Sequence, residues 1–162
     1  MADGKIEKLR NAKLTFKRSM VWESEIENYV KNRIKGYSLN IPAGSSKLGD
    51  IRADIAPQLP EVIKEDMLNL SFKKNIFDTV ISDPPWKLNY FHRMRQFFEL
   101  VRVCKVNGRI IFNATWLPES KAVQLEEIWV RQSARFGNIS IMAVFKKITD
   151  IYDKEREAMK DD

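Results

Sequence analysis

The sequence predicts an α/β fold with a C-terminal antiparallel hairpin, on three observations. Short apolar runs bounded by turn residues recur along the chain and are typical of strands. The segments 23–35 and 89–105 carry apolar residues at helical spacing. Near the C-terminus, two β-like runs flank the turn-rich residues 133–138, as in a hairpin. At 162 residues the chain is most simply one domain with room for a real core.

The first half of the chain is expected to hold one helix and four strands. The helix covers 23–35, where Ser24 offers an N-cap and Gly36 a stop signal. Its apolar residues fall on one face, at Ile26, Tyr29, Val30 and Ile34. The strands are expected near 38–42, 50–55, 61–65 and 77–82.

The second half is expected to begin with a helix over 89–105. Its apolar stripe, which includes Cys104, is assigned to the core, whereas Arg93, Arg95 and Arg102 are assigned to the exposed side. A strand at 109–114, a short helical turn near 118–123, and a hairpin pairing 125–131 with 139–147 complete the prediction. Residues 1–20 read as a basic arm and 149–162 as a charged tail, either an exposed helix or frayed.

Residues 83–86 read Asp-Pro-Pro-Trp and directly follow the apolar run 77–82. A carboxylate at the end of a buried strand, two residues without N–H groups and a flat ring form a rigid acceptor loop for a planar amine. The adenine amino group is the best candidate, because its lone pair is delocalised and its two hydrogens must be drawn out of conjugation. Asp83 can accept one hydrogen and the carbonyl of Pro84 the other, while Pro85 stiffens the loop and Trp86 offers a stacking face.

A plain strand-ending turn is the alternative interpretation, since Asp and Pro are common turn residues. Other chemistry has less support. Cys104 is the single cysteine, so it cannot form an internal disulfide, and it is interpreted as buried packing. With His92 as the single histidine, the chain offers no metal-ligand set, and we expect no metal.

The chain resembles the S-adenosylmethionine-dependent amino-methyltransferases, which methylate adenine N6 or cytosine N4. Asp-Pro-Pro-Trp matches the catalytic motif of that family, and the resemblance runs from about Tyr37 to Lys147. The order of the motifs, with a cofactor loop after the strand near 38–42 and the catalytic loop later, fits a class I methyltransferase. The resemblance implies a Rossmann-like, mostly parallel sheet with a C-terminal antiparallel hairpin, in a methyltransferase domain spanning 21–148.

The same resemblance implies S-adenosyl-L-methionine as the cofactor. An acid at the position of Asp54 binds the ribose hydroxyls in the family, and one at Asp66 lies near the cofactor adenine, although both could instead be solvated strand-end carboxylates. The usual Gly-x-Gly turn is reduced here to Gly44, and the next glycine is Gly49. The expected cofactor-binding residues are Pro42, Ala43, Gly44, Asp54, Asp66 and Asp83.

Substrate contacts are expected at the carboxyl ends of the strands, where ligands of open α/β sheets bind. Asn113 and Trp116 follow the strand at 109–114, although Trp116 could instead pack against the loop 117–120. The net charge of +6 and the isoelectric point near 9.4 favour a polyanionic partner. The expected substrate residues are Trp86, Lys87, Asn113, Trp116 and Arg135, of which Lys87 is the better phosphate ligand and Arg135 the weaker.

Taken together, these features predict a site-specific DNA adenine N6 methyltransferase that acts on a flipped-out base. RNA adenine and DNA cytosine N4 are alternative targets. A catalytically inactive nucleic-acid-binding scaffold is a further alternative, motivated by the reduced glycine loop. The sequence has no apolar run of membrane-spanning length and no secretory signal, which predicts an intracellular, cytoplasmic protein without membrane contact.

The connections between the predicted strands are shorter than parallel crossovers with helices require. They span about 43–49, 56–60 and 66–76. Several helices of the sheet must therefore be shortened or absent, which would leave apolar surface near the first three strands or near the hairpin. A homodimer is expected to bury that surface.

Overall fold

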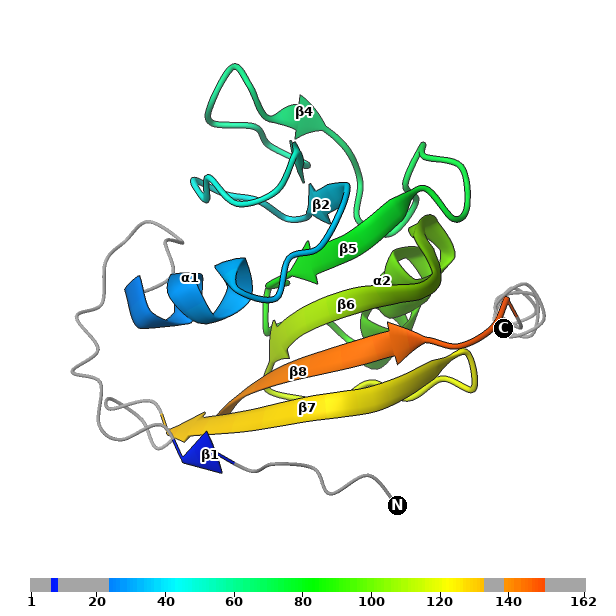
Figure 1. The fold of residues 1–162 in the computed structure, drawn as a ribbon. Coiled ribbons are helices and arrows are strands. Elements are labelled where there is room, and N and C mark those ends of the chain that lie inside the picture. Colours follow the sequence, from blue (N-terminus) through cyan, green and yellow to red (C-terminus); the bar gives the residue numbers. More distant parts are fainter. Residues whose placement is uncertain (1–6, 9–23, 133–138, 151–162) are drawn as a thin grey trace.

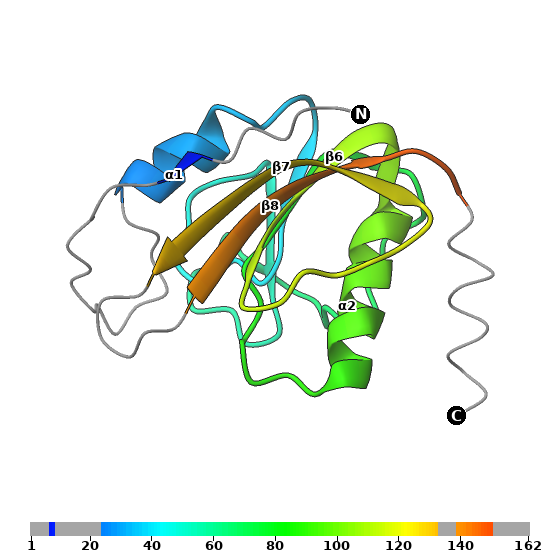
Figure 2. The ribbon, with the colours of Figure 1, turned by 90° about the horizontal axis from the view of Figure 1, so that it is seen from below.

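The computed structural model describes residues 7–8, 24–132 and 139–150. Its strands form one sheet in the order β1-β7-β8-β6-β5-β2-β3-β4 (Figure 1). Two helices, α1 (Ser24–Lys31) and α2 (Tyr90–Val103), lie on opposite faces of this sheet (Figure 2). The strands are β1 (Glu7–Lys8), β2 (Ser38–Asn40), β3 (Ile51–Asp54), β4 (Ile63–Lys64), β5 (Phe77–Ser82), β6 (Cys104–Ala114), β7 (Val123–Gln132) and β8 (Ile139–Lys147).

The pairing confirms the predicted fold class. Strands β2 to β6 pair parallel with one another, and β8 pairs antiparallel with both β6 and β7. From β2 the chain moves outward through β3 to β4, then returns to the other side of β2 as β5 and continues to β6. The direction of winding therefore reverses between β2 and β5, the point at which open α/β sheets bind their ligands.

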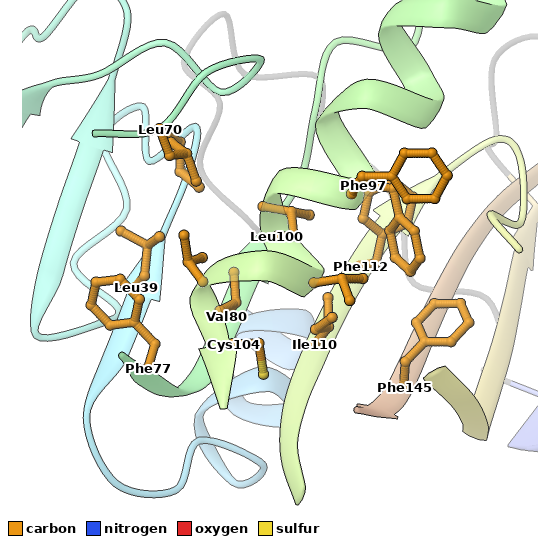
Figure 3. Close-up of a cluster of buried hydrophobic side chains, with 14 of the residues drawn as sticks. Leu39, Leu70, Phe77, Val80, Phe97, Leu100, Cys104, Ile110, Phe112 and Phe145 are labelled. Carbon is orange, nitrogen blue, oxygen red and sulfur yellow. The ribbon is translucent and has the colours of Figure 1, made fainter. Parts of the chain in front are cut away.

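A hydrophobic cluster fills each face of the sheet. On the α2 face, the ring of Phe97 meets those of Phe112 and Phe145 edge-on, at centroid distances of 5.5 and 5.2 Å (Figure 3). On the α1 face, Tyr29 and Val30 pack with side chains of β5, β6 and β8. The apolar stripes predicted for both helices thus lie in the core.

Between residues 41 and 76, all of which the structure describes, turns and short strands replace the crossover helices. The loop 65–76 contributes Met67, Leu70 and Phe72 to the larger cluster, and Leu48 joins the smaller one. These loops cover β2, whose residues are all buried. Ile55 and Ile63 stay exposed near β3 and β4, so part of the predicted apolar surface is present, and the homodimer stays a prediction.

A buried ion pair fastens the longest of these loops to α2. The carboxylate of Glu99 is 1% exposed and accepts hydrogen bonds from Arg102 Nη2 at 2.8 Å and from the Leu70 N–H at 2.9 Å. Arg102 also donates to the carbonyls of Leu70 and Phe72, at 2.8 and 2.7 Å. The pair therefore satisfies backbone groups that a crossover helix would have satisfied internally.

Several sequence predictions need correction. The first helix ends at Lys31, not at residue 35. The second ends at Val103, because Cys104 pairs with Phe77 and begins β6. Arg102 faces the loop 65–76 rather than solvent. The helical turn near 118–123 is wrong: a turn at Ser120 leads directly into β7, whose pairing with β8 prevails over helix formation.

Replacing Arg102 with Ala should lower the free energy of unfolding by about 3 kcal/mol or more, because it leaves the Glu99 carboxylate buried without its counter-charge. Urea denaturation measures the loss. Arg52→Ala is the matched control, since Arg52 pairs at 3.4 Å with the exposed Glu61 and such pairs contribute less than about 1 kcal/mol. Equal losses of stability in the two variants would contradict the stabilising role of the buried Glu99–Arg102 pair.

Candidate active site

The loops after β2 and β5 lie on either side of the point where the winding reverses. The N–H of Ile41 donates to the carbonyl of Ile81 at 2.9 Å, so the two strands stay paired up to the start of both loops. The loop 41–46 and the segment 83–89 therefore leave the sheet from adjacent strands at the same edge. This edge is where we predicted both the cofactor and the catalytic loop from the sequence.

The loop after β2 is tied to the end of β3 by Asp54. Gly44 has a φ of 52°, a conformation that favours glycine, and its N–H donates to Asp54 Oδ2 at 3.0 Å. The other carboxylate oxygen of Asp54 accepts from the Ala56 N–H, also at 3.0 Å. Next to Gly44, the hydroxyl of Ser45 is buried and has no hydrogen-bond partner in the described part of the chain. Pro42 and Ala43 precede it, and Ala43 is buried.

Gly49 has a different role from the one that a second glycine of a cofactor loop would have. Its φ is 92°, and an added Cβ would come within 3.2 Å of the Asn40 Cβ and of the Ile51 carbonyl oxygen. Gly49 therefore lets the loop pass close to the backbone of β2 and β3. Gly44 is the glycine that lies beside Asp54.

Asp66 lies in the turn after β4 and is exposed. Its Oδ1 accepts a hydrogen bond from the Leu68 N–H at 2.9 Å, which stabilises that turn. The N–H of Glu65 donates to the Asp54 carbonyl at 3.0 Å, so Asp66 follows directly on the last backbone contact with β3. Asp54 is thus bonded to the loop after β2, whereas Asp66 lies one strand farther out.

The carboxylate of Asp83 is held by a relay that crosses the sheet. Asn113 Nδ2, at the end of β6, donates to Asp83 Oδ1 at 3.1 Å. The Ser140 hydroxyl, on β8, donates to Asn113 Oδ1 at 2.7 Å. Asn113 and Ser140 are 6% and 5% exposed. Because a carboxylate can only accept, the amide of Asn113 has one orientation that serves both neighbours.

Arg93 contacts both tryptophans of the site, Trp86 and Trp116. Its Nη2 donates to the Trp86 carbonyl at 3.3 Å, and its guanidinium lies 4.3 Å from the centroid of the Trp116 ring. Trp116 also meets Phe112 edge-on at 5.9 Å. Arg93 is therefore half-buried, not on the exposed side of the helix as predicted. The ring of Trp116 packs on Phe112 in the core rather than standing free.

A second polar contact lies at the start of the segment 83–89. The side chain of Gln96, on α2, is fully buried and donates to the hydroxyl of Ser82 at 2.8 Å. Ser82 immediately precedes Asp83, so this bond anchors the end of β5. Sequence reasoning missed Gln96, Ser140 and the role of Arg93. The available signal was a polar residue inside an apolar run, since buried polar groups require partners.

The remaining predicted residues differ in their placement. Pro84 is buried, while Pro85 and Lys87 are exposed on the loop. Arg135 lies outside the described residues. Burial raises the pKa of the Cys104 thiol to about 12, which removes it as a nucleophile at neutral pH. Among the described residues, no group of three or more His, Cys, Asp or Glu side chains could hold a metal ion.

No protein-family model matches the chain, and no curated protein matches its sequence. Solved structures do match. The N-methyltransferase NodS from Bradyrhizobium japonicum WM9, in complex with S-adenosyl-L-homocysteine, aligns with a TM-score of 0.59 and 12% identity, over 76% of this chain and 86% of NodS. A TehB-like SAM-dependent methyltransferase from Corynebacterium glutamicum aligns with a TM-score of 0.56 and 15% identity, over 75% of this chain and 86% of that one.

The chain has the class I methyltransferase fold. A third match comes from a study of the conversion of a disulfide bond into a thioacetal group during echinomycin biosynthesis, with a TM-score of 0.57 and 14% identity over 83% of this chain and 87% of the other. At these identities the likeness establishes the fold. Of the helices in the described ranges, none has the length and apolar character needed to cross a membrane.

The Asp83–Asn113 contact makes a pH-dependent prediction for Asn113→Asp. The substitution places two carboxyl groups in contact, so one of them should have a raised pKa in the folded state. A group whose pKa is raised by folding destabilises the folded state above its unfolded pKa. The deficit relative to the unsubstituted protein should therefore be larger at pH 7 than at pH 4, by on the order of 1.4 kcal/mol for each unit of pKa difference.

Urea denaturation at the two pH values measures this difference. Ser140→Ala is the control, because it removes a hydroxyl from the same relay without adding a charge, and its deficit should be independent of pH. A pH-independent deficit in Asn113→Asp would contradict the contact.

Proposed function

We propose that the protein is an S-adenosylmethionine-dependent methyltransferase that modifies the N6 amino group of adenine in DNA. The observation that carries this proposal is the Asp83 carboxylate, held by Asn113 at the end of β5 and followed by Pro84, Pro85 and Trp86. It lies at the edge of the sheet where this fold binds ligands. A loop that only ended a strand would not require a buried relay to orient its carboxylate.

The residues around Gly44 fit a nucleoside-containing cofactor. Each carboxylate oxygen can accept two hydrogen bonds, so Asp54, which accepts one backbone N–H on each oxygen, can still accept from ribose hydroxyls. The buried hydroxyl of Ser45, which has no hydrogen-bond partner among the described residues, gives the same loop a polar group that the cofactor could bond. Pro42, Ala43 and Gly44 would line the loop, Asp66 would face the adenine end, and Asp83 the reactive end. When bound, S-adenosyl-L-methionine supplies an electrophilic methyl group.

Asp83 and Pro84 act on the amine that receives this group. Their oxygens accept its two hydrogens, which turns the nitrogen lone pair out of conjugation with the ring. Asn113 keeps the Asp83 carboxylate in this orientation throughout. The nitrogen loses one proton after transfer, and Asp83 is the acceptor positioned to take it. Trp86 supports the extracted base by stacking.

Three features favour a nucleic acid over a small molecule. Lys87 follows the motif and is exposed, the chain carries a net charge of +6, and Trp86 offers a face for a base. DNA is the preferred substrate, with RNA adenine and DNA cytosine N4 as alternatives. The inactive scaffold is disfavoured by the relay, which a binding-only module has no reason to keep.

Incubation with radiolabelled S-adenosylmethionine and separate DNA, RNA and protein acceptors tests the proposal, with nucleoside analysis of the product. We expect label in N6-methyladenine from DNA. Label in N4-methylcytosine, in RNA or in protein would reassign the substrate, and no label in any acceptor would support the scaffold.

Asp83→Ala should reduce methyl transfer by on the order of 10²-fold or more while leaving cofactor affinity largely intact, because the carboxylate acts on the amine. Single-turnover assays and cofactor titration measure the two effects. Glu119→Ala, which removes an exposed carboxylate from the loop after β6, is the control and should keep full activity. Near-normal turnover of Asp83→Ala would refute the mechanism.

Trp86→Ala should weaken substrate binding by about 1–3 kcal/mol through loss of the stacking face. Trp86→Phe and Trp86→Tyr should keep much of the activity, because each retains an aromatic ring. Steady-state kinetics with oligonucleotide substrates distinguish the variants. Equal KM values for the Ala and Phe variants would exclude stacking at this position.

A further inference from the structure

Two aromatic rings are exposed directly after the catalytic loop. Tyr90 is 66% exposed and Phe91 59%, more than any other aromatic side chain in the described part of the chain. Their rings meet edge-on at a centroid distance of 5.8 Å. Leaving two large apolar side chains in water forgoes the stabilisation that burial would give, and such exposed patches mark interaction sites.

The two rings are held in a fixed position relative to the catalytic loop. Asn89 caps α2 by accepting a hydrogen bond from the His92 N–H at 2.9 Å, which orders the helical turn that carries both rings. One residue farther, Arg93 donates to the Trp86 carbonyl at 3.3 Å. The aromatic pair and Trp86 therefore belong to one continuous, braced segment.

The charged residues of the segment that carries the two rings favour one kind of binding partner over another. The segment from Pro84 to Phe98 contains no acidic residue, whereas the exposed Lys87 and Arg95 are basic. A second copy of this chain, also at +6, would bring like charge to the same surface. A nucleic-acid strand combines negative charge with flat apolar faces, which suits both the cations and the rings.

We propose that Tyr90 and Phe91 form a stacking platform for a base next to the target adenine, on the same DNA strand. This inference rests on the proposed function and extends it, since Trp86 would hold the extracted base and the platform its neighbour. Stacking on aromatic rings tolerates any base, so the platform contributes affinity without sequence preference. It suits a strand whose bases are already unstacked around the flipped nucleotide.

The test uses the full-length protein with S-adenosyl-L-homocysteine and a fluorescent single-stranded DNA that contains one adenine. Fluorescence anisotropy compares the unsubstituted protein with the double variant Tyr90→Ala/Phe91→Ala. We expect the Kd of the double variant to rise at least about tenfold. In methylation assays its KM for DNA should rise similarly, while kcat at saturating DNA stays within about threefold.

A second DNA, abasic at the positions beside the adenine, separates stacking from a general effect on the fold. Removing these bases should weaken binding by the unsubstituted protein and have little further effect on the double variant. Tyr37→Ala is the control and should bind both DNAs as the unsubstituted protein does, because it removes a 45% exposed ring that directly precedes β2, at the opposite end of the strands.

Unchanged Kd and KM in the double variant would overturn the platform, as would equal weakening of both proteins by the abasic DNA. A self-association in sedimentation that the double variant abolishes, with DNA binding intact, would also overturn it and assign the rings to a dimer. If the double variant lost affinity for RNA but not for DNA, the DNA assignment would be overturned. If the double variant and the abasic DNA affected Kd as expected but no methyl group was transferred to DNA, the proposed function would be refuted and the platform would stand.

Discussion

A parallel sheet that is apolar on both faces must be covered on both, and this constraint governs the whole molecule. In its described residues, the chain meets it with two helices and with loops whose apolar side chains take the place of crossover helices. The loop 65–76 can do this because Glu99 and Arg102 satisfy its backbone groups from α2. Without that buried pair, the Leu70 N–H and the carbonyls of Leu70 and Phe72 would lose these hydrogen bonds.

The short connections between strands also bring the residues of the candidate site together. With so little chain between the strands, the polar residues that matter lie at the strand ends themselves. Asp54 ends β3, Asp83 follows β5, and Asn113 stands near the end of β6. Parallel strands place these ends at one edge of the sheet, and the reversal of winding between β2 and β5 puts the two loops side by side. The relay through Asn113 to Ser140 then fixes the carboxylate that the proposed chemistry needs.

The sequence was sufficient for the strands from β2 to β8, the hairpin and the loop that carries Asp83, because hydrophobic periodicity and proline act locally. It did not predict β1, which lies in the segment expected to be a basic arm. It was insufficient where a residue serves a distant partner. Arg102 and Arg93 look like surface arginines on a helix, yet each bonds a segment that the sequence does not place beside it. Cys104 fits the helical stripe, but pairing with Phe77 makes it a strand residue. Asn113 was predicted to contact the substrate, and that role stays a prediction. Its bond to Asp83 could not be predicted, because it requires β6 to lie beside β5 in the sheet.

The proposed activity depends most on whether a loop with one glycine beside Asp54 still forms a cofactor site. Isothermal titration calorimetry of S-adenosylmethionine into the full-length protein tests this claim directly. We expect one molecule bound per chain, with affinity reduced about tenfold or more in Asp54→Ala, because a charged hydrogen-bond partner is lost. No binding to the unsubstituted protein, or unchanged affinity in Asp54→Ala, would contradict it.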